Sequence, residues 1–403
     1  MKCIFAIIAW VCLTLPAGAA ELRPFPQHQA YAAGSILPSI PAADRDAAVA
    51  GFYDQWKARY LKEKCGEGRY VVDINDEGTG FLSISEGHGY GMLITVFMAG
   101  HDPDAQKLFD GLYHFFREHH AASNPDLLAW RQTKDCKDDG TDTATDGDLD
   151  IAQSLLLADK QWGSAGPVNY KAEALKVIAA IEAHEIAPKS FHVLMGDWAS
   201  LDEPKQYYGT RTSDFMLSHF RSFAAATGTA LWPKVIERTY GLIETIQSSA
   251  AKDTGLLPDF ISHLDGQPRP AEPNFLEGPN DGGLAYNACR DPWRIGLDFL
   301  LYGEPHAKVA VDRWTSFMKK QSGGDLAKLL AGYRLDGSPT VDYGDMAFVA
   351  PLGVGAMASA DNQAFVDAIW KATVAQPIKK GKYYSNTLKM LTLIAMSGNW
   401  WQP

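Results

Sequence analysis

The stretch ALKVIAAIEAH, residues 174–184, places apolar side chains at positions 174, 177, 178 and 181. This spacing lines one face of an α-helix, and it recurs in KVIERTYGLIETI (234–246) and AKVAVDRWTSFMK (307–319). Elsewhere in the chain, the alternating pattern of a strand occurs in YVVDI (70–74) and FLSIS (81–85), which predict a small hairpin. The predicted helices are residues 45–61, 89–99, 104–118, 148–160, 170–184, 214–226, 232–248, 292–302, 306–321, 343–358, 363–372 and 384–397.

Helices of ordinary length joined by irregular loops, without a low-complexity linker, predict one all-α domain over residues 21–403. Twelve helices can pair into six helical hairpins that close into a toroid. No strict sequence repeat accompanies them, so the periodicity indicates an all-α fold and is compatible with the toroid without requiring it.

The chain has 403 residues, 46% of them hydrophobic, and a formal net charge of −11, which argues against a nucleic-acid partner. Residues 1–20, MKCIFAIIAWVCLTLPAGAA, start with a lysine, continue as a short apolar run and end in small residues, as a signal peptide does. No later stretch stays apolar long enough to span a bilayer. We therefore predict a secreted protein, extracellular or periplasmic, with no membrane partner.

Three cysteines lie beyond the predicted signal peptide: Cys65, Cys136 and Cys289. Two interpretations stay open: a Cys65–Cys136 disulfide formed in an oxidising compartment, or three free cysteines. No Cys/His spacing indicates a zinc site, and we predict neither a metal nor a cofactor.

Glu86 stands in SISEGHGYGM (83–92), where Gly87, Gly89 and Gly91 follow it. One interpretation is structural, because Ser83-x-x-Glu86 fits a capping box at a helix start. Each glycine disfavours a helix interior by about 1 kcal/mol, and glycines let a ligand approach the backbone closely. The two interpretations are compatible, since a carboxylate in the first helical turn can cap the helix and still face a cleft.

A second acidic stretch, KDDGTDTATDGDLDIAQSLLLADKQW, covers residues 137–162. Thr145-x-x-Asp148 predicts a cap for the following helix, which leaves Asp146 exposed on the loop entering it and without a structural role. No register of these aspartates supplies the full calcium-loop pattern, so the stretch predicts either a solvated acidic turn or a functional carboxylate.

The third stretch is EPNFLEGPNDGGLAYNACRDPWRIGLDFLLYG, residues 272–303, in which Asp291-Pro292 predicts a helix start with Asp291 as the N-cap. The loop before it carries Glu272, Glu277 and Asp281. Cleavage of an acetal needs a proton donor on one side and a base or nucleophile on the other. Carboxylates on loops of different helices could provide both.

Aromatic side chains near these stretches are candidates for packing on the apolar faces of sugar rings. Trp130 and Trp198, on predicted loops, are better candidates than aromatics inside periodic helices. Tyr90 and Tyr207 are the other two that we predict to contact substrate.

The blocks SEGHGYGM, ATDGDLDIAQSLLLADKQW and YNACRDPWRI together resemble glycoside hydrolase family 8, a group of bacterial endo-acting cellulases, chitosanases, lichenases and xylanases. TRTSDFM, FVAPLGVGAMA and SNTLKMLTLIAMSGNWWQP extend the resemblance over essentially the whole mature chain. The resemblance implies an (α/α)6 barrel and inversion at the anomeric carbon. Such inversion requires two carboxyl groups roughly 6.5–9.5 Å apart, with a water between base and sugar.

The resemblance also implies roles for individual residues. Glu86 matches the general acid, and Asp146 matches the aspartate that binds and distorts the sugar at the cleavage point. One branch of the family has an aspartate base where this chain has Asn287, and an amide cannot accept the proton. A second branch, with chitosanases and lichenases, has a glutamate in the preceding loop, which Glu277 matches.

Asp281 and Glu272 remain alternative bases. Arg211, Asn287 and Arg290 lie in or beside the matching blocks and are predicted to bind sugar hydroxyls.

We therefore predict a monomeric, secreted, inverting endo-β-1,4-glycanase whose partner is a β-1,4-linked polysaccharide: chitosan, mixed-linked β-glucan or a cellulose-like glucan. The alternatives are a xylanase, a polysaccharide lyase, or a polysaccharide-binding or cell-wall assembly protein that has lost catalysis.

Overall fold

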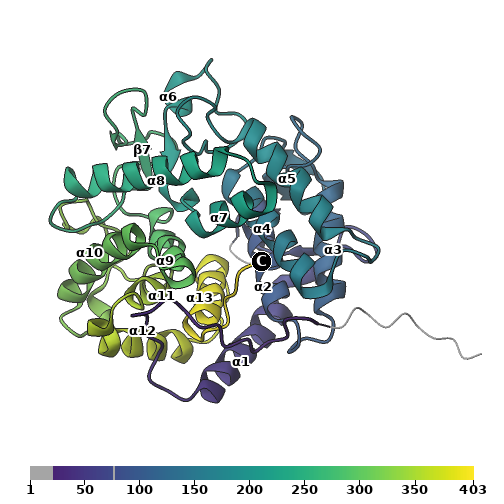
Figure 1. Ribbon diagram of the computed structural model, residues 1–403, viewed down its shortest axis with the longest axis horizontal. Helices are drawn as coiled ribbons and strands as arrows, with labels where there is room; N and C mark the ends of the chain where they lie inside the picture. Colours follow the sequence, from purple (N-terminus) through teal and green to yellow (C-terminus); the bar gives the residue numbers. More distant parts are fainter. Residues whose placement is uncertain (1–20, 76–77) are drawn as a thin grey trace, which may run out of the picture.

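Six helices form an inner ring around the centre of the molecule, and six others pack against its outside (Figure 1). The computed structural model describes residues 21–75 and 78–403, so the predicted signal peptide lies outside the described residues. The inner helices are α2 (Ser85–Phe97), α4 (Thr145–Trp162), α7 (Leu217–Thr227), α9 (Asp291–Tyr302), α11 (Met346–Ala356) and α13 (Tyr383–Met396). The outer helices are α1 (Ala42–Tyr60), α3 (Ala105–Glu118), α5 (Tyr170–His184), α8 (Leu231–Ser248), α10 (Pro305–Ser322) and α12 (Gln363–Ala375).

Outer and inner helices alternate along the chain, and each inner helix contacts the next, with α13 returning to α2. The fold is therefore an (α/α)6 barrel, and all twelve predicted helices are confirmed. Of the α-helices in residues 21–75 and 78–403, the sequence pattern missed only α6 (Pro204–Tyr207), a single turn too short to show periodicity. Over the described residues, no helix combines the length and apolarity needed to cross a membrane.

The inner helices differ from the outer ones in how much of their surface is buried. Helix α2 buries every residue except Glu86, and α13 buries every residue except Tyr384. The outer helix α1 buries only six of its nineteen residues, which form one stripe. On α2 and α13 the single residue that is not buried therefore lies in the first turn, at the same end of each helix.

The glycines after Glu86 allow helices to pack closely. A Cβ on Gly89 would lie 2.7 Å from the Asp150 Cβ and 2.9 Å from the Gly147 carbonyl oxygen, both on α4. A Cβ on Gly87 would lie 2.4 Å from the Tyr383 hydroxyl of α13. The prediction that these glycines admit a ligand to the backbone is wrong, because neighbouring helices fill the space.

Short strands lie mainly before and between the helices. Strands β1 (Leu61–Glu63) and β2 (Tyr70–Val72) form one antiparallel pair. A second sheet has the order β3-β4-β5 and a third the order β6-β7-β8. The predicted YVVDI–FLSIS hairpin is wrong, because β2 pairs with β1 while FLSIS, as β3, pairs with β4. The remaining strands are β3 (Phe81–Ile84), β4 (Arg131–Thr133), β5 (Asp138–Gly140), β6 (Thr210–Arg211), β7 (Phe260–Ser262) and β8 (Arg269–Pro270).

The three predicted caps are also wrong. Ser83 lies in β3, and α2 begins only at Ser85, so no capping box with Glu86 forms. Thr145 is the first residue of α4 and its hydroxyl donates to the Leu194 carbonyl instead. Asp291 is likewise inside α9, after Arg290 as N-cap. In each case a polar residue that fits a cap locally has a tertiary environment that the local pattern does not encode.

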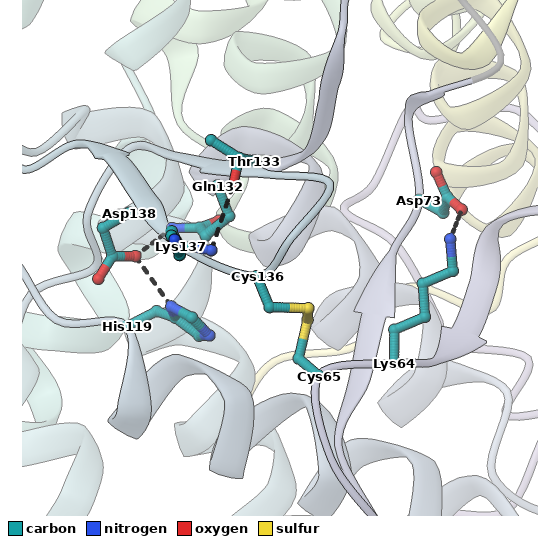
Figure 2. Close-up of a disulfide and its surroundings, with 9 residues drawn as sticks. All are labelled: Lys64, Cys65, Asp73, His119, Gln132, Thr133, Cys136, Lys137 and Asp138. Carbon is teal, nitrogen blue, oxygen red and sulfur yellow. Dashed lines mark hydrogen bonds and ion pairs between the residues drawn. A yellow bond between two sulfur atoms is a disulfide. The ribbon is translucent and has the colours of Figure 1, made fainter.

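A disulfide joins Cys65 to Cys136 across 71 residues of sequence, with the two Cα atoms 5.5 Å apart, and Cys289 is free and buried (Figure 2). Of the two interpretations left open by the sequence, the disulfide is the one found. It links the β1–β2 turn to the β4–β5 turn, and the His119–Asp138 ion pair at 2.9 Å lies beside it.

The inner helices all begin at the same end of the barrel, because each is separated from the next by one outer helix of opposite direction. The starts of these helices carry polar residues, which the topology brings together although they are spread over 300 residues of sequence. These residues are Glu86, Asp146, Asp214, Arg290, Asp345 and Tyr384.

Candidate active site

A cavity of about 490 Å³ opens at this end of the barrel. Glu86 and Glu277 both line it, together with Asn287 and Arg290 between them. Tyr286 and Tyr384 form part of its wall, and the Tyr384 hydroxyl donates to the Tyr286 carbonyl at 2.5 Å. The two carboxyl groups predicted from distant stretches therefore share one cavity.

Arg290 is the centre of the hydrogen-bond network beneath the cavity. It is 1% exposed and comes from the short 3-10 helix η3 (Ala288–Arg290) that leads into α9. Its Nη1 donates to Glu86 Oε2 at 2.7 Å, Asp146 Oδ2 at 2.9 Å and Tyr90 OH at 3.2 Å, and its Nη2 to Ser213 Oγ at 2.8 Å and Asn287 Oδ1 at 2.9 Å. The guanidinium thereby fixes side chains from α2, α4 and the segment before α7 relative to one another.

Glu86 has the environment of a proton donor. Burial raises the pKa of Glu86 to about 7, with the Asp146 carboxylate acting in the same direction and the Arg290 guanidinium opposing both. Its side chain still keeps 15% of its surface exposed towards the cavity. A carboxyl group that holds its proton close to neutral pH and reaches a cavity can act as a general acid.

Glu277 has a different environment. Its side chain is 48% exposed and accepts hydrogen bonds from Asn287 Nδ2 at 2.8 Å and Arg211 Nη2 at 3.4 Å. Amide and guanidinium donors are partners of an ionised carboxylate. Glu86 and Glu277 are thus not in direct contact but are joined through Arg290 and Asn287, so the two acidic groups stay apart across the cavity.

The surroundings of Glu277 differ from those of the two alternative bases, Asp281 and Glu272. Asp281 is buried, and its carboxylate accepts from the main-chain N–H groups of Leu276, Glu277 and Gly278 at 2.7, 3.0 and 2.8 Å. It shapes the turn that presents Glu277. Glu272 is 68% exposed and pairs with Arg269 at 3.5 Å, outside the network.

Asp146 lies in the first turn of α4 and is only 3% exposed, so the prediction that it is exposed on a loop is wrong. Its Oδ1 accepts from the Gly147 N–H and its Oδ2 from Arg290. The prediction treated Asp146 as free of structural contacts, because its partner Arg290 lies 144 residues away.

The sequence analysis did not identify two carboxyl groups of the site, Asp259 and Asp214. Asp259 accepts from the main-chain N–H groups of Ala285, Asn287 and Ala288 and from Asn287 Nδ2, so it holds the loop that carries Asn287. Asp214 lies 3.8 Å from Arg211, and burial raises the pKa of Asp214 to about 7. A lone aspartate inside an apolar run, as in LLPDFIS, is the signal that could have indicated Asp259.

The predicted aromatic residues are not equivalent. Tyr90 is fully buried below Arg290 and cannot stack on a sugar, so it acts on the site only through its hydroxyl. Trp130 is half-buried, and its carbonyl accepts from the Ser85 N–H at the start of α2. Trp198 packs against an apolar cluster that includes Met195. Tyr207 packs edge-on against His192, and within the described residues it has no hydrogen bond to the Arg290 network.

Within the described residues, no group of three or more His, Cys, Asp or Glu side chains is arranged to hold a metal ion. The cluster instead offers proton-transfer groups: a carboxyl group with a raised pKa and a second carboxylate held apart from it. Two carboxyl groups of this kind beside one cavity are the arrangement that the class of glycoside hydrolases uses.

The family model of glycosyl hydrolases family 8 matches residues 24–398, and the chain belongs to this family. The predicted resemblance and the predicted enzyme class are thereby confirmed. The chain is 43% identical over 394 residues to a β-glucanase of Niallia circulans, covering 96% of this chain and 94% of the relative. It is 38% identical over 395 residues to an endoglucanase of Bacillus sp. strain KSM-330, covering 96% and 83%.

Among solved structures, the apo β-1,3-1,4-glucanase from Paenibacillus sp. X4 superposes with a TM-score of 0.91 at 41% sequence identity. The match covers 95% of this chain and 100% of that one. The helical ring is therefore similar over its whole length to that of a solved β-1,3-1,4-glucanase.

Proposed function

We propose that this protein is an inverting endo-β-glucanase that hydrolyses β-1,4 linkages in a β-glucan, with Glu86 as general acid, Glu277 as general base and Asp146 positioning the sugar at the cleavage point. The observation that carries the proposal is the chain of contacts Glu86–Arg290–Asn287–Glu277 along one cavity wall.

The acid step follows from the state of Glu86. With the pKa of Glu86 raised to about 7, the carboxyl group is largely protonated in mildly acidic solution and donates its proton to the glycosidic oxygen. Arg290, which also donates to Asp146, fixes the carboxyl group in place. When the proton leaves, the Arg290 guanidinium already lies 2.7 Å away and stabilises the carboxylate that forms.

The base step follows from the position of Glu277. Its carboxylate is half-exposed and reaches the solvent of the cavity, so it can take a proton from a water that attacks the anomeric carbon. Two side chains, Arg290 and Asn287, intervene between Glu277 and Glu86, which suits a water-mediated displacement better than direct attack by a carboxylate. Asn287 serves as the holder of Glu277 in this scheme.

Mixed-linked β-glucan is the substrate that we place first. The names of the relatives, β-glucanase, endoglucanase and β-1,3-1,4-glucanase, support a β-glucan over chitosan, which the sequence alone left open. We further propose that the protein is exported and acts as a monomer. The Cys65–Cys136 disulfide fits an oxidising compartment, and one chain supplies every residue of the network.

A reducing-sugar assay over mixed-linked β-glucan, carboxymethylcellulose, chitosan and xylan tests the substrate. We expect mixed-linked β-glucan to give the highest kcat/KM. Proton NMR of the first product is expected to show the α anomer, because inversion converts a β linkage into an α hemiacetal. A β anomer in the first minutes would rule out inversion, and chitosan as the best substrate would replace the substrate proposal.

The base is tested by a matched pair of variants. Glu277→Gln and Glu272→Gln make the same chemical change in the same loop, but only Glu277 contacts the network. We expect Glu277→Gln to lower kcat by roughly 10²–10⁴-fold and Glu272→Gln to leave it unchanged. The reverse result would transfer the role of base away from Glu277.

A further inference from the structure

A second cavity, of about 460 Å³, adjoins the active-site cavity. It lies among the starts of α11 and α13, the end of α12 and the segment that joins α12 to α13. Asp345, Lys382 and Ser385 line both cavities, so the two meet at the starts of α11 and α13. A group attached to a glycan in the active site could therefore enter this second cavity, which we call the lysine cavity.

The lysine cavity has a positive lining in a negatively charged protein. Three lysines line it, Lys379, Lys382 and Lys389, against a single carboxylate, Asp345, whereas the chain as a whole carries −11. Asp345 is already engaged, because it accepts from the Ser385 hydroxyl at 2.5 Å and the Ala347 N–H at 2.9 Å and pairs with Lys382 at 3.4 Å. Among the described residues, no carboxylate pairs with either of the other two ammonium groups.

Lys389 is the buried member, with 2% of its surface exposed. Its Nζ donates to the carbonyl oxygens of Gln376 and Pro377 at 3.0 and 3.3 Å. Burial, together with the positive charge of Lys379, lowers the pKa of Lys389 to about 8. Two cations that repel each other beside a cavity are stabilised by an anion placed between them.

The segment that carries Lys379 is fixed to the barrel. Asn386 Nδ2 donates to the Lys379 carbonyl at 2.8 Å, and the Lys379 N–H donates to Asn386 Oδ1 at 3.3 Å. Asn386 is itself held by a 2.6 Å hydrogen bond to the Tyr60 hydroxyl of α1. Leu329, Met346 and Val349 supply an apolar part of the cavity lining. The three lysines therefore line a cavity whose wall is held by hydrogen bonds. The apolar part of its lining can accept a short aliphatic chain.

We propose that the lysine cavity binds an anionic group, a carboxylate or a phosphate, supplied either as an acidic substituent on the glucan or as a free anion. The substituent form rests on the proposed function, because it requires a glucan in the neighbouring active site. The free-anion form does not depend on the proposed function.

The test compares Lys379→Glu with Lys107→Glu. Both reverse the charge of an exposed lysine, but Lys107 lies on α3, outside the lining of either cavity. Inorganic phosphate and succinate are titrated into each protein by isothermal titration calorimetry. In parallel, kcat/KM is measured on carboxymethylated and on neutral mixed-linked β-glucan, at low salt and with about 0.5 M NaCl, where screening is strong.

For a substituent, we expect Lys379→Glu to lower the ratio of kcat/KM on carboxymethylated to neutral glucan by about tenfold at low salt, with a smaller fall at high salt. For a free anion, we expect Lys379→Glu to abolish the binding of phosphate or succinate that wild type and Lys107→Glu retain. Either result supports the proposal and identifies the source. If both readouts of Lys379→Glu equal those of Lys107→Glu, the proposal is overturned. A wild type without activity on neutral glucan would instead refute the proposed function, while the titration still decides whether the cavity binds an anion.

Discussion

Two arginine–aspartate pairs connect α4 to the α9 region, one helical turn apart, and they differ in what surrounds them. The upper pair, Asp146–Arg290, lies beneath the active-site cavity. The lower pair, Asp150–Arg294, lies deeper in the barrel, where both side chains are no more than 1% exposed. Both helices advance by four residues between the pairs, so the same spacing produces both.

The lower pair is complete in itself. Arg294 donates to both oxygens of Asp150, at 2.8 and 2.6 Å, and His219 Nε2 lies 2.9 Å from the same carboxylate. Burial alone would raise the pKa of Asp150, but the Arg294 guanidinium and the hydrogen bond from His219 together outweigh it and hold that pKa below its ordinary value. The lower pair therefore remains charged and joins two inner helices.

The upper pair is shared. Arg290 divides its N–H groups among Glu86, Asp146, Tyr90, Ser213 and Asn287, so no single carboxylate receives both of its arms. Burial therefore keeps the pKa of Glu86 raised although a permanent cation lies beside it. The difference between the pairs shows how one helix–helix repeat gives a closed ion pair deep in the barrel and, at its mouth, a carboxyl group with a raised pKa, which is the proposed proton donor.

Glu86→Gln should produce the largest effect on kcat. It changes the surroundings of the upper pair, Asp146–Arg290, and leaves the lower pair intact. Glutamine keeps an oxygen for Arg290 but has no proton to donate, so we expect kcat to fall by roughly 10²–10⁴-fold. We expect the thermal midpoint to stay the same or rise, because a buried acid is replaced by a neutral group. Reducing-sugar release and thermal unfolding measure the two quantities. A variant that retained wild-type kcat would remove Glu86 from the mechanism.

Arg294→Met should give the converse result, with stability lost. It leaves Asp150 as a buried carboxylate without its bidentate partner, which costs about 3–5 kcal/mol in the free energy of unfolding. Urea denaturation measures the loss, and the double variant Asp150→Asn/Arg294→Met should recover part of it. A loss below about 1 kcal/mol would show that His219 alone suffices to hold Asp150.

The sequence predicted the helices well because each of them buries a face with regular spacing, and 170–184 even matches α5 at both ends. It also identified Glu86, Asp146, Glu277, Asn287 and Arg290, which the fold brings into one network. These residues stand in blocks that resemble a known family. Their selection therefore came from the resemblance more than from local physical pattern.

Local patterns failed where a polar residue has a distant partner. Ser83, Thr145 and Asp291 each fitted a helix cap, and none of them makes the predicted cap. Asp146 was predicted to be exposed because Arg290, which compensates its charge, lies 144 residues away. Pairings of that kind depend on how the barrel closes, which the spacing along a single helix does not contain.

The pH dependence of activity tests how the upper pair, Asp146–Arg290, affects the pKa of Glu86. With the pKa of Glu86 raised to about 7, kcat/KM should fall about tenfold for each pH unit above that value. Asp146→Asn removes a neighbouring anion that raises this pKa, so the alkaline limb of its residual activity should shift to lower pH. Because burial lowers the pKa of His88 to about 4, that nearby histidine is neutral in this range and does not contribute. An unchanged limb in Asp146→Asn would contradict the coupling.

The same pKa has a consequence for stability, with a definite sign. Glu86 binds its proton more tightly in the folded state, so its contribution is fully present below the ordinary carboxyl pKa and is lost as pH rises through about 7. The decline in the free energy of unfolding over this interval should be smaller in Glu86→Gln. Urea titrations at several pH values provide the measurement, and an equal decline in both proteins would argue against a raised pKa.

Tyr90→Phe should have the smallest effect on kcat. It tests whether Tyr90, which contacts both Arg290 and Arg294, connects the upper pair to the lower pair. The Tyr90 hydroxyl accepts from Arg290 at 3.2 Å, while the centre of its ring lies 5.6 Å from the Arg294 guanidinium. Removing the hydroxyl should cost about 0.5–1.5 kcal/mol of unfolding free energy and lower kcat a few-fold, since Arg290 keeps its other acceptors.

Tyr170→Phe is the matched control, because it removes a hydroxyl that donates to Asp110 on the outer helix α3. It should lose similar stability with kcat unchanged. If Tyr90→Phe behaved like this control, the tyrosine would only fill space between the pairs. A fall in kcat confined to Tyr90→Phe would show that a fully buried hydroxyl helps to set the position of the guanidinium on which Glu86 depends.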